Sequence, residues 1–188
     1  IPIFHMEAGN RCFDLRVPEE INRKIVDHLS DINMPYSEQA KNNLIKEGIH
    51  PAQIIKTGSP QKEILDFYDD SINKSQILSK LKLPEKKYFL ASIHREENVD
   101  TPAKLKEIIS SFESITSHFK YKLILSLHPR TRNRLEEQNI KFGKNIIDLK
   151  PMGFFDYVSL QKNAYCVISD SGTIFEESSI LGLSLIHI

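Results

Sequence analysis

The chain has 188 residues and carries 25 Lys and Arg against 25 Asp and Glu, so its formal net charge is zero. A neutral chain lacks the basic surface expected of proteins that bind nucleic-acid phosphates or anionic membranes. Its 40% hydrophobic content suffices for a folded core, and no apolar run approaches the ~18 residues of a membrane span. We therefore expect a folded protein without nucleic-acid or membrane partners.

The two cysteines, Cys12 and Cys166, are far apart in the sequence and form no CxxC pair. Neither a disulfide framework nor a zinc site is indicated, and no basic-then-apolar leader opens the chain. A reducing cytoplasm is the expected compartment. The chain opens on Ile1 inside one apolar run and closes on another, so we expect both ends to be cut from a longer protein.

Short apolar runs alternate along the chain with segments of helical periodicity. In chain order, the expected elements are strand 1–6, helix 18–29, strand 31–35, helix 37–47, strand 53–57, helices 60–69 and 72–81, strand 87–93, helix 102–118, strand 121–127, helix 131–139, strand 145–149, helix 154–162, strand 165–169, helix 173–181 and strand 183–188. This alternation predicts an α/β protein with parallel sheets and helices on both faces.

Capping residues support several of these boundaries. Thr101 and Pro102 are typical of a helix start, as is Ser37. Gly48 and Gly182 stand where helices commonly end. The polar stretch 69–75 is the most linker-like segment, and we expect a domain boundary near residue 70.

Polar clusters follow four of the expected strands, at residues 5–11, 94–98, 128–130 and 170–173. In open parallel sheets, ligands bind outside the carboxyl ends of the strands. We therefore expect a binding site formed by these clusters.

The segment 170–173 leads from a strand into a helix, whose free N–H groups favour an anion. Gly172 would let a phosphate approach the backbone, and Glu177 could accept hydrogen bonds from a ribose. The alternative is a plain helix start, in which Thr173 and Glu176 form a capping box.

Three further residues are candidates for acid–base chemistry. His94 directly follows an apolar strand and could act as a general acid or base, or as a phosphate donor; the alternative is a structural histidine. Glu7 ends an expected buried strand, and Glu19 with Glu20 opens the next helix. Paired carboxylates suit proton transfer at a sugar carbon, although Glu19 and Glu20 also complement a helix dipole. No His or carboxylate pair has the spacing of a metal site.

Five segments together identify a resemblance. They read HMEAGNRCFD (5–14), VPEEINRKIVDHLSD (17–31), KTGSPQKEIL (56–65), SIHREENVD (92–100) and SDSGTIFEES (169–178). In order and spacing they resemble the non-hydrolysing UDP-N-acetylglucosamine 2-epimerase family. The resemblance implies two Rossmann-like domains facing each other in the GT-B architecture. Residues 1–69 would be the C-terminal part of the first domain and 70–188 most of the second, UDP-binding domain.

The resemblance also implies the chemistry: epimerisation at C2 by anti elimination of UDP and its re-addition through a glycal, with no nicotinamide and no catalytic metal. Glu7 and Glu19 match the acidic residues that transfer the C2 proton, and His94 the histidine that assists departure of UDP. Ser171 and Gly172 match the phosphate cradle, Glu177 the ribose-binding carboxylate and Tyr157 the aromatic residue near uracil. Thr173 stands where many members have glycine.

The loop with Asn10 and Cys12 resembles the branch that epimerises modified UDP-sugars for surface polysaccharides. The same resemblance allows a homodimer. Two other functions stay open: a GT-B glycosyltransferase that uses a UDP-sugar, and a UDP-binding module without catalysis. Because the segments before residue 1 and after residue 188 would complete the family's site, we expect the 188-residue chain alone to be inactive and poorly stable.

Overall fold

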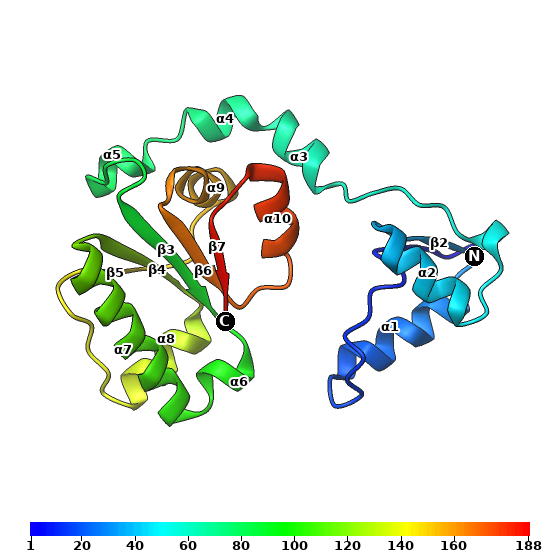
Figure 1. Ribbon diagram of the computed structural model, residues 1–188, viewed down its shortest axis with the longest axis horizontal. Helices are drawn as coiled ribbons and strands as arrows, with labels where there is room; N and C mark the ends of the chain where they lie inside the picture. Colours follow the sequence, from blue (N-terminus) through cyan, green and yellow to red (C-terminus); the bar gives the residue numbers. More distant parts are fainter. The chain divides into compact units, whose positions relative to one another are not determined.

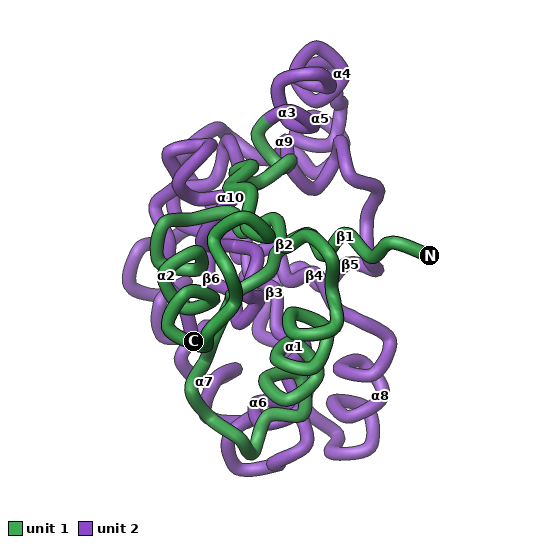
Figure 2. The backbone as a smooth tube through the Cα atoms, turned by 90° about the vertical axis from the view of Figure 1, so that its right-hand side faces the viewer, with its two compact units in different colours: residues 1–62 green, residues 63–188 purple.

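The computed structural model describes residues 1–188, which form two compact units, Ile1–Lys62 and Glu63–Ile188. Figure 2 shows the first unit in green and the second in purple. No helix is both long and apolar enough to cross a membrane.

The first unit is a small parallel α/β segment. It comprises β1 (Phe4–Met6), α1 (Pro18–Leu29), β2 (Ile32–Met34), α2 (Glu38–Lys46) and a 3-10 turn at Pro51–Gln53. Strands β1 and β2 pair in parallel, with Phe4 opposite Ile32. The buried core of this unit is formed by Ala8, Leu44, Ile49 and Ile54.

The second unit is built on one five-stranded sheet (Figure 1). Its elements are α3 (Gln61–Phe67, which begins in the first unit), α4 (Asp69–Asn73), α5 (Ile77–Leu81), β3 (Tyr88–Ile93), α6 (Glu96–Val99), α7 (Pro102–Phe119), β4 (Lys122–Leu127), α8 (Pro129–Glu137), β5 (Ile146–Leu149), α9 (Phe154–Asn163), β6 (Cys166–Ser169), α10 (Ile174–Leu181) and β7 (Leu185–His187). All neighbouring strands are parallel, in the order β5-β4-β3-β6-β7.

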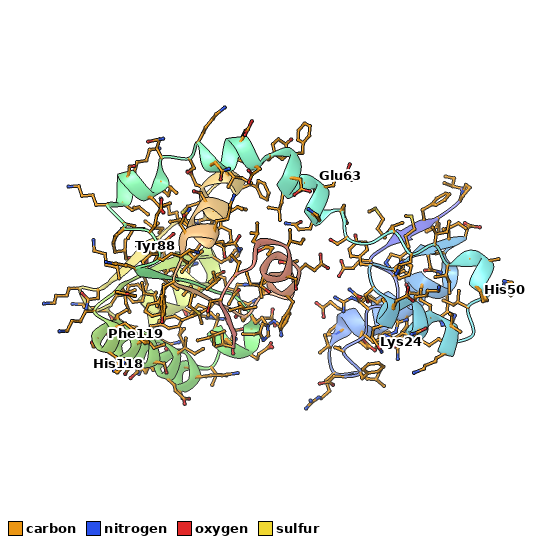
Figure 3. The ribbon with its side chains drawn as sticks, turned by 45° about the horizontal axis from the view of Figure 1, so that its top comes forward. Lys24, His50, Glu63, Tyr88, His118 and Phe119 are labelled. Atoms are coloured by element: carbon orange, nitrogen blue, oxygen red, sulfur yellow. The ribbon has the colours of Figure 1, made fainter.

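Both faces of this sheet are covered, because its central strands are apolar on both sides. Along β3, Phe89 and Ile93 belong to a buried cluster with α7 and α8, whereas Tyr88 and Leu90 belong to a second cluster with α5, α9 and α10. Tyr88, at the start of β3 (Figure 3), donates its hydroxyl to the Leu160 carbonyl oxygen at 2.7 Å. The predicted α/β class, with helices on both faces of a parallel sheet, is confirmed here.

The strand order reverses between β3 and β6. From β3 the chain moves outward to β4 and β5, then returns to the other side of β3 for β6 and β7. Such a switch point opens a crevice at the carboxyl ends of the two strands, which is where ligands bind in doubly wound sheets. His94 follows β3 and Asp170 follows β6 at this position.

Two predicted elements were wrong in detail. The segment 53–57 runs beside β2, and Ile55 donates its N–H to the Asn33 carbonyl at 2.9 Å, but only Ile54 forms a bridge. Pro35, which follows β2, has no N–H with which to extend a ladder.

The expected helix 72–81 is two helices, α4 and α5, and most of the expected linker 69–75 is α4. The break lies at Ser75, whose hydroxyl oxygen accepts the Ile77 N–H at 3.2 Å and whose hydroxyl donates to Asp156 Oδ1 at 2.6 Å. The boundary between the two compact units falls in the sequence after Lys62. The assignment of 1–69 and 70–188 to two Rossmann-like domains stays a prediction.

The four-residue helix α6 was not predicted, since it is too short to show periodicity.

Candidate functional site

The second unit contains a pocket of about 240 Å³ at the switch point. Its polar lining residues are Ser92, His94, Ser126, Tyr157, Ser169, Ser171, Thr173 and Glu177. Four of the predicted site residues, His94, Tyr157, Ser171 and Glu177, therefore line one pocket. They come from the turn after β3, from α9, from the β6–α10 turn and from α10, so the fold gathers them from distant parts of the sequence.

Asp170 is the buried centre of this site. It is 0% exposed, and its carboxylate accepts the backbone N–H groups of His94 at 3.0 Å and Arg95 at 2.9 Å. It also accepts a hydrogen bond from the Asn98 side chain at 3.0 Å. Burial by itself raises the pKa of Asp170, but these hydrogen bonds and one from the His94 ring outweigh it and hold the pKa well below its usual range. Asp170 is therefore an ionised anchor for the loop after β3.

The His94 ring lies against this anchor. Its Nδ1 is 3.0 Å from Asp170 Oδ1, and its side chain is 45% exposed. The hydrogen bond with Asp170 raises the pKa of His94 despite partial burial. The ring therefore has a larger protonated fraction near neutral pH than a free histidine would. In the protonated form it can donate a hydrogen bond or a proton to an anion in the pocket.

The N-terminus of α10 borders the same pocket. The alternative of a capping box lacks its Thr173 side-chain bond: Thr173 is the N-cap but makes no side-chain cap bond, and its hydroxyl instead lies 3.0 Å from the Ser171 hydroxyl. A Cβ added to Gly172 would meet nothing nearer than the Arg95 guanidinium, at 4.0 Å. The backbone N–H groups of this helix start, the hydroxyls of Ser171 and Thr173 and the Arg95 guanidinium thus surround open space beside Gly172. Such an arrangement favours the binding of an anion.

Glu177 and Tyr157 form the inner wall of the pocket. Glu177 accepts a hydrogen bond from the Gln161 side chain at 2.5 Å, and burial raises its pKa. Burial likewise raises the pKa of Tyr157 to about 12, although its hydroxyl hydrogen-bonds with Ser92. Both groups are held in place by neighbours, which suits them to bind a ligand rather than to exchange protons with solvent.

In the first unit, Glu7 directly follows β1 and is exposed. The expected burial of the strand before it is not seen in these 188 residues, where β1 pairs only with β2 and its Phe4 and Met6 are exposed. Glu7 has a left-handed φ of 63°, which costs on the order of 1–3 kcal/mol in a non-glycine residue and tends to occur at functional sites. Its Oε1 accepts a hydrogen bond from the Asn10 amide at 2.9 Å.

The two glutamates that begin α1 have different environments. Glu19 is exposed in the first turn. Glu20 is 0% exposed and accepts the Cys12 N–H at 2.9 Å, with Lys24 of the same helix (Figure 3) 3.6 Å away. Glu20 therefore holds the loop at Cys12, whereas the Glu19 side chain lies at the surface.

A second buried anchor, Asp27, was missed by the sequence analysis. It accepts hydrogen bonds from Arg11 Nη2 at 2.6 Å, from the Gly9 N–H at 3.2 Å and from His5 Nδ1 at 2.7 Å. Arg11, whose side chain is fully buried, also bonds Glu47 at 2.6 Å. Asp27 lies in a polar helix, and nothing in that pattern separates it from solvated acids. For Asp170 a signal was present: an acid directly after a short, mostly apolar strand.

The model of one protein family, described as UDP-N-acetylglucosamine 2-epimerase, matches residues 1–188. The chain is 36% identical over 189 residues to the UDP-N-acetylglucosamine 2-epimerase of Methanocaldococcus jannaschii, covering 96% of this chain and 51% of that protein. It is 33% identical to the UDP-2,3-diacetamido-2,3-dideoxy-D-glucuronate 2-epimerase of Pseudomonas aeruginosa, covering 97% and 50%. The chain thus spans about half the length of the curated relatives it matches.

Solved structures of UDP-N-acetylglucosamine 2-epimerases are also similar to this chain. The structure is similar to UDP-N-acetylglucosamine 2-epimerase from Rickettsia bellii, with a TM-score of 0.89, 48% identity, and coverage of 100% of this chain and 50% of that one. It is also similar to the Methanocaldococcus jannaschii enzyme in complex with UDP-GlcNAc and UDP, with a TM-score of 0.90, 36% identity, and coverage of 100% and 53%. Both likenesses extend over the whole of this chain.

Proposed function

The chain belongs to the UDP-N-acetylglucosamine 2-epimerase family, and from this premise we propose that the protein containing it inverts C2 of a UDP-2-acetamido sugar. The substrate would be UDP-GlcNAc or UDP-ManNAc, or a deoxy or diacetamido relative used for surface polysaccharides. The observation that carries the proposal is the pocket at the switch point, where an ionic His94–Asp170 pair, a helix N-terminus and Glu177 lie together.

The proposed reaction is balanced without an external oxidant. A carboxylate removes the C2 proton, the C1–C2 double bond forms, and the C1–O bond breaks with its electron pair leaving on the diphosphate of UDP. UDP then adds back to C1 as a proton is delivered to the opposite face of C2. One residue must accept a proton and another supply it, and we assign Glu7 and Glu19 to these roles.

The UDP moiety is proposed to lie in the second unit. The N-terminus of α10, with Ser171 and Gly172, would hold the diphosphate, because its free N–H groups and dipole favour negative charge. Glu177 would accept hydrogen bonds from the ribose hydroxyls, and Tyr157 would lie close to the uracil. Protonated His94 would stabilise the charge that develops on the departing diphosphate.

Two further features of the protein belong to the proposal. Both cysteines are free thiols, Cys12 exposed and Cys166 buried, as expected in a reducing cytoplasm. We also propose a homodimer as the assembly, to be checked by light scattering of the full-length protein.

Incubation of the full-length protein with a panel of UDP-sugars in deuterated water tests the function. We expect NMR to show the C2 epimer with deuterium at C2, because the proton is exchanged with solvent during elimination. Glu7→Gln should lower turnover by about 10²-fold or more, the range of general acid–base catalysis. The exposed Glu136→Gln variant serves as the matched control and should retain activity.

Other results would select other functions. Sugar transfer to an acceptor, with Glu7→Gln fully active, would identify a glycosyltransferase. UDP binding without turnover on the whole panel would identify a binding module. The 188-residue chain, assayed in parallel, is expected to show no turnover, because it spans about half the length of its relatives; activity of the chain alone would contradict that expectation.

A further inference from the structure

We propose that Asp170 is a positioning residue that fixes the tautomer and the charge of His94 in the pocket. Its buried carboxylate would keep a proton on Nδ1 and present Nε2 to the ligand. The consequence for catalysis rests on the proposed function, but the positioning itself does not.

The arrangement follows from the pairing of β3 with β6. Ser92 and Ser169 are partners in these parallel strands, so the residues that follow them leave the sheet side by side. Asp170, 0% exposed, is consequently directed at the turn that begins with His94. Oδ1 lies 3.0 Å from the ring Nδ1, and both carboxylate oxygens lie within 3.1 Å of the His94 backbone nitrogen.

The tautomer follows from the chemistry of the acceptor. An ionised carboxylate has no proton to donate, so the ring atom that faces Asp170 must be Nδ1–H. In neutral His94 the remaining nitrogen, Nε2, is then an acceptor, and in the imidazolium it is a donor. This division of roles resembles a catalytic histidine oriented by a buried carboxylate.

The charges around the ring determine how readily Nε2 is protonated. Asp170 favours the imidazolium, whereas partial burial and the neighbouring Arg95 oppose it, and the net effect is a raised pKa for His94. Tyr157 and Glu177 line the same pocket. In the proposed reaction, Nε2–H would give its proton to the diphosphate oxygen as the C1–O bond breaks, and would recover it when UDP adds back.

A purely structural role for Asp170 makes a different prediction. Asp170 also holds the Arg95 N–H and the Asn98 side chain, so it could serve only to fix the loop. The Asn98→Ala variant separates the two roles, since it removes one loop contact and leaves the ring contact in place. If Asp170 acts on His94, Asp170→Asn should change the ring titration and Asn98→Ala should not.

The test is a ¹⁵N-histidine NMR titration of the full-length protein and of these two variants of it. In the wild type we expect the Nδ1–H tautomer at high pH and a His94 pKa above the ordinary value of about 6.5. Asp170→Asn should lower this pKa, because it removes the carboxylate that favours the imidazolium, while Asn98→Ala should keep the wild-type titration even if it lowers thermal stability. An Nε2–H tautomer in the wild type, or an unchanged titration in folded Asp170→Asn, would overturn the proposal.

The titration gives a result even if the Asp170→Asn variant does not fold or the epimerase assay fails. If Asp170→Asn does not fold, the wild-type tautomer alone decides, because it needs no variant. The titration also needs no substrate, so its outcome is independent of the epimerase assay. In the full-length enzyme, Asp170→Asn should shift the alkaline limb of the kcat profile to lower pH, whereas Asn98→Ala should leave the position of that limb unchanged.

Discussion

At the residue scale, buried acids arrange the loops that carry the proposed catalytic groups. Asp27 and Glu20 hold the loop that carries Glu7, and Asp170 holds the loop that carries His94. A buried carboxylate is costly unless hydrogen bonds compensate it. Asp27 and Asp170 each accept several hydrogen bonds, whereas Glu20 accepts them on Oε2 only and has Lys24 3.6 Å from its Oε1. The same feature that stabilises the ionised acid therefore fixes the backbone beside the site.

Asp27→Asn tests this principle in the first unit. Removing the charge leaves buried Arg11 with Glu47 alone, and breaking a buried ion pair costs about 3–5 kcal/mol. We expect the lower end of that range, because Glu47 stays as a partner, and urea unfolding of the 188-residue chain measures it.

Asp14→Asn is the matched control for this variant. Asp14 pairs with Arg16, whose side chain is 90% exposed, and exposed pairs contribute little to stability. Its urea midpoint should match that of the wild type. Equal urea midpoints for Asp27→Asn and Asp14→Asn would show that the buried Arg11–Asp27 pair contributes no more to stability than the exposed Arg16–Asp14 pair.

At the element scale, two helices that both have a hydroxyl residue at the N-cap differ in how that residue is used. Ser37 accepts the Ala40 N–H at 3.1 Å at the start of α2, whereas Thr101 at the start of α7 makes no side-chain cap bond. Loss of a capping hydroxyl typically costs about 1 kcal/mol. Ser37→Ala should therefore lower the unfolding free energy by about 1 kcal/mol and Thr101→Ala by less than about 0.5 kcal/mol.

Urea unfolding of the two alanine variants, followed by circular dichroism, distinguishes these effects. Each change removes the hydroxyl of an N-cap, and Thr101→Ala also removes a methyl group from an exposed side chain. A larger loss for Thr101→Ala than for Ser37→Ala would contradict the assignment of the two caps.

At the scale of the whole molecule, each hydrophobic cluster draws its residues from a single compact unit. The two clusters that cover the faces of the five-stranded sheet lie within residues 77–188, and the small cluster of the first unit lies within residues 8–54. Because the core is the main source of folding free energy, we expect residues 63–188 to fold when expressed alone.

This expectation is checked by amide NMR of the 63–188 fragment. Dispersed resonances at the shifts found in the 188-residue chain, with the same His94 titration, would agree with it. A collapsed spectrum without dispersion would show that the second unit depends on residues 1–62.

Periodicity and capping patterns predicted most of the elements correctly. Helix α1 has the expected bounds, and the continuous apolar runs of β3 and β4 are buried. Errors arose where local contacts compete with periodicity, as at Ser75, which divides one expected helix into two. The expected burial of the strand before Glu7 is not seen in these 188 residues, where β1 has β2 as its single neighbour.

The sequence by itself determined the α/β class, the family and the residues available for chemistry, since hydrophobic periodicity and contiguous motifs are local properties of the chain. Only the tertiary structure decided which polar residues meet. The order β5-β4-β3-β6-β7 brings Asp170 to His94 across 76 positions of sequence, and Arg11 to Glu47 across 36. Burial then gives these contacts their strength, because a charge removed from water must find its partner within the fold.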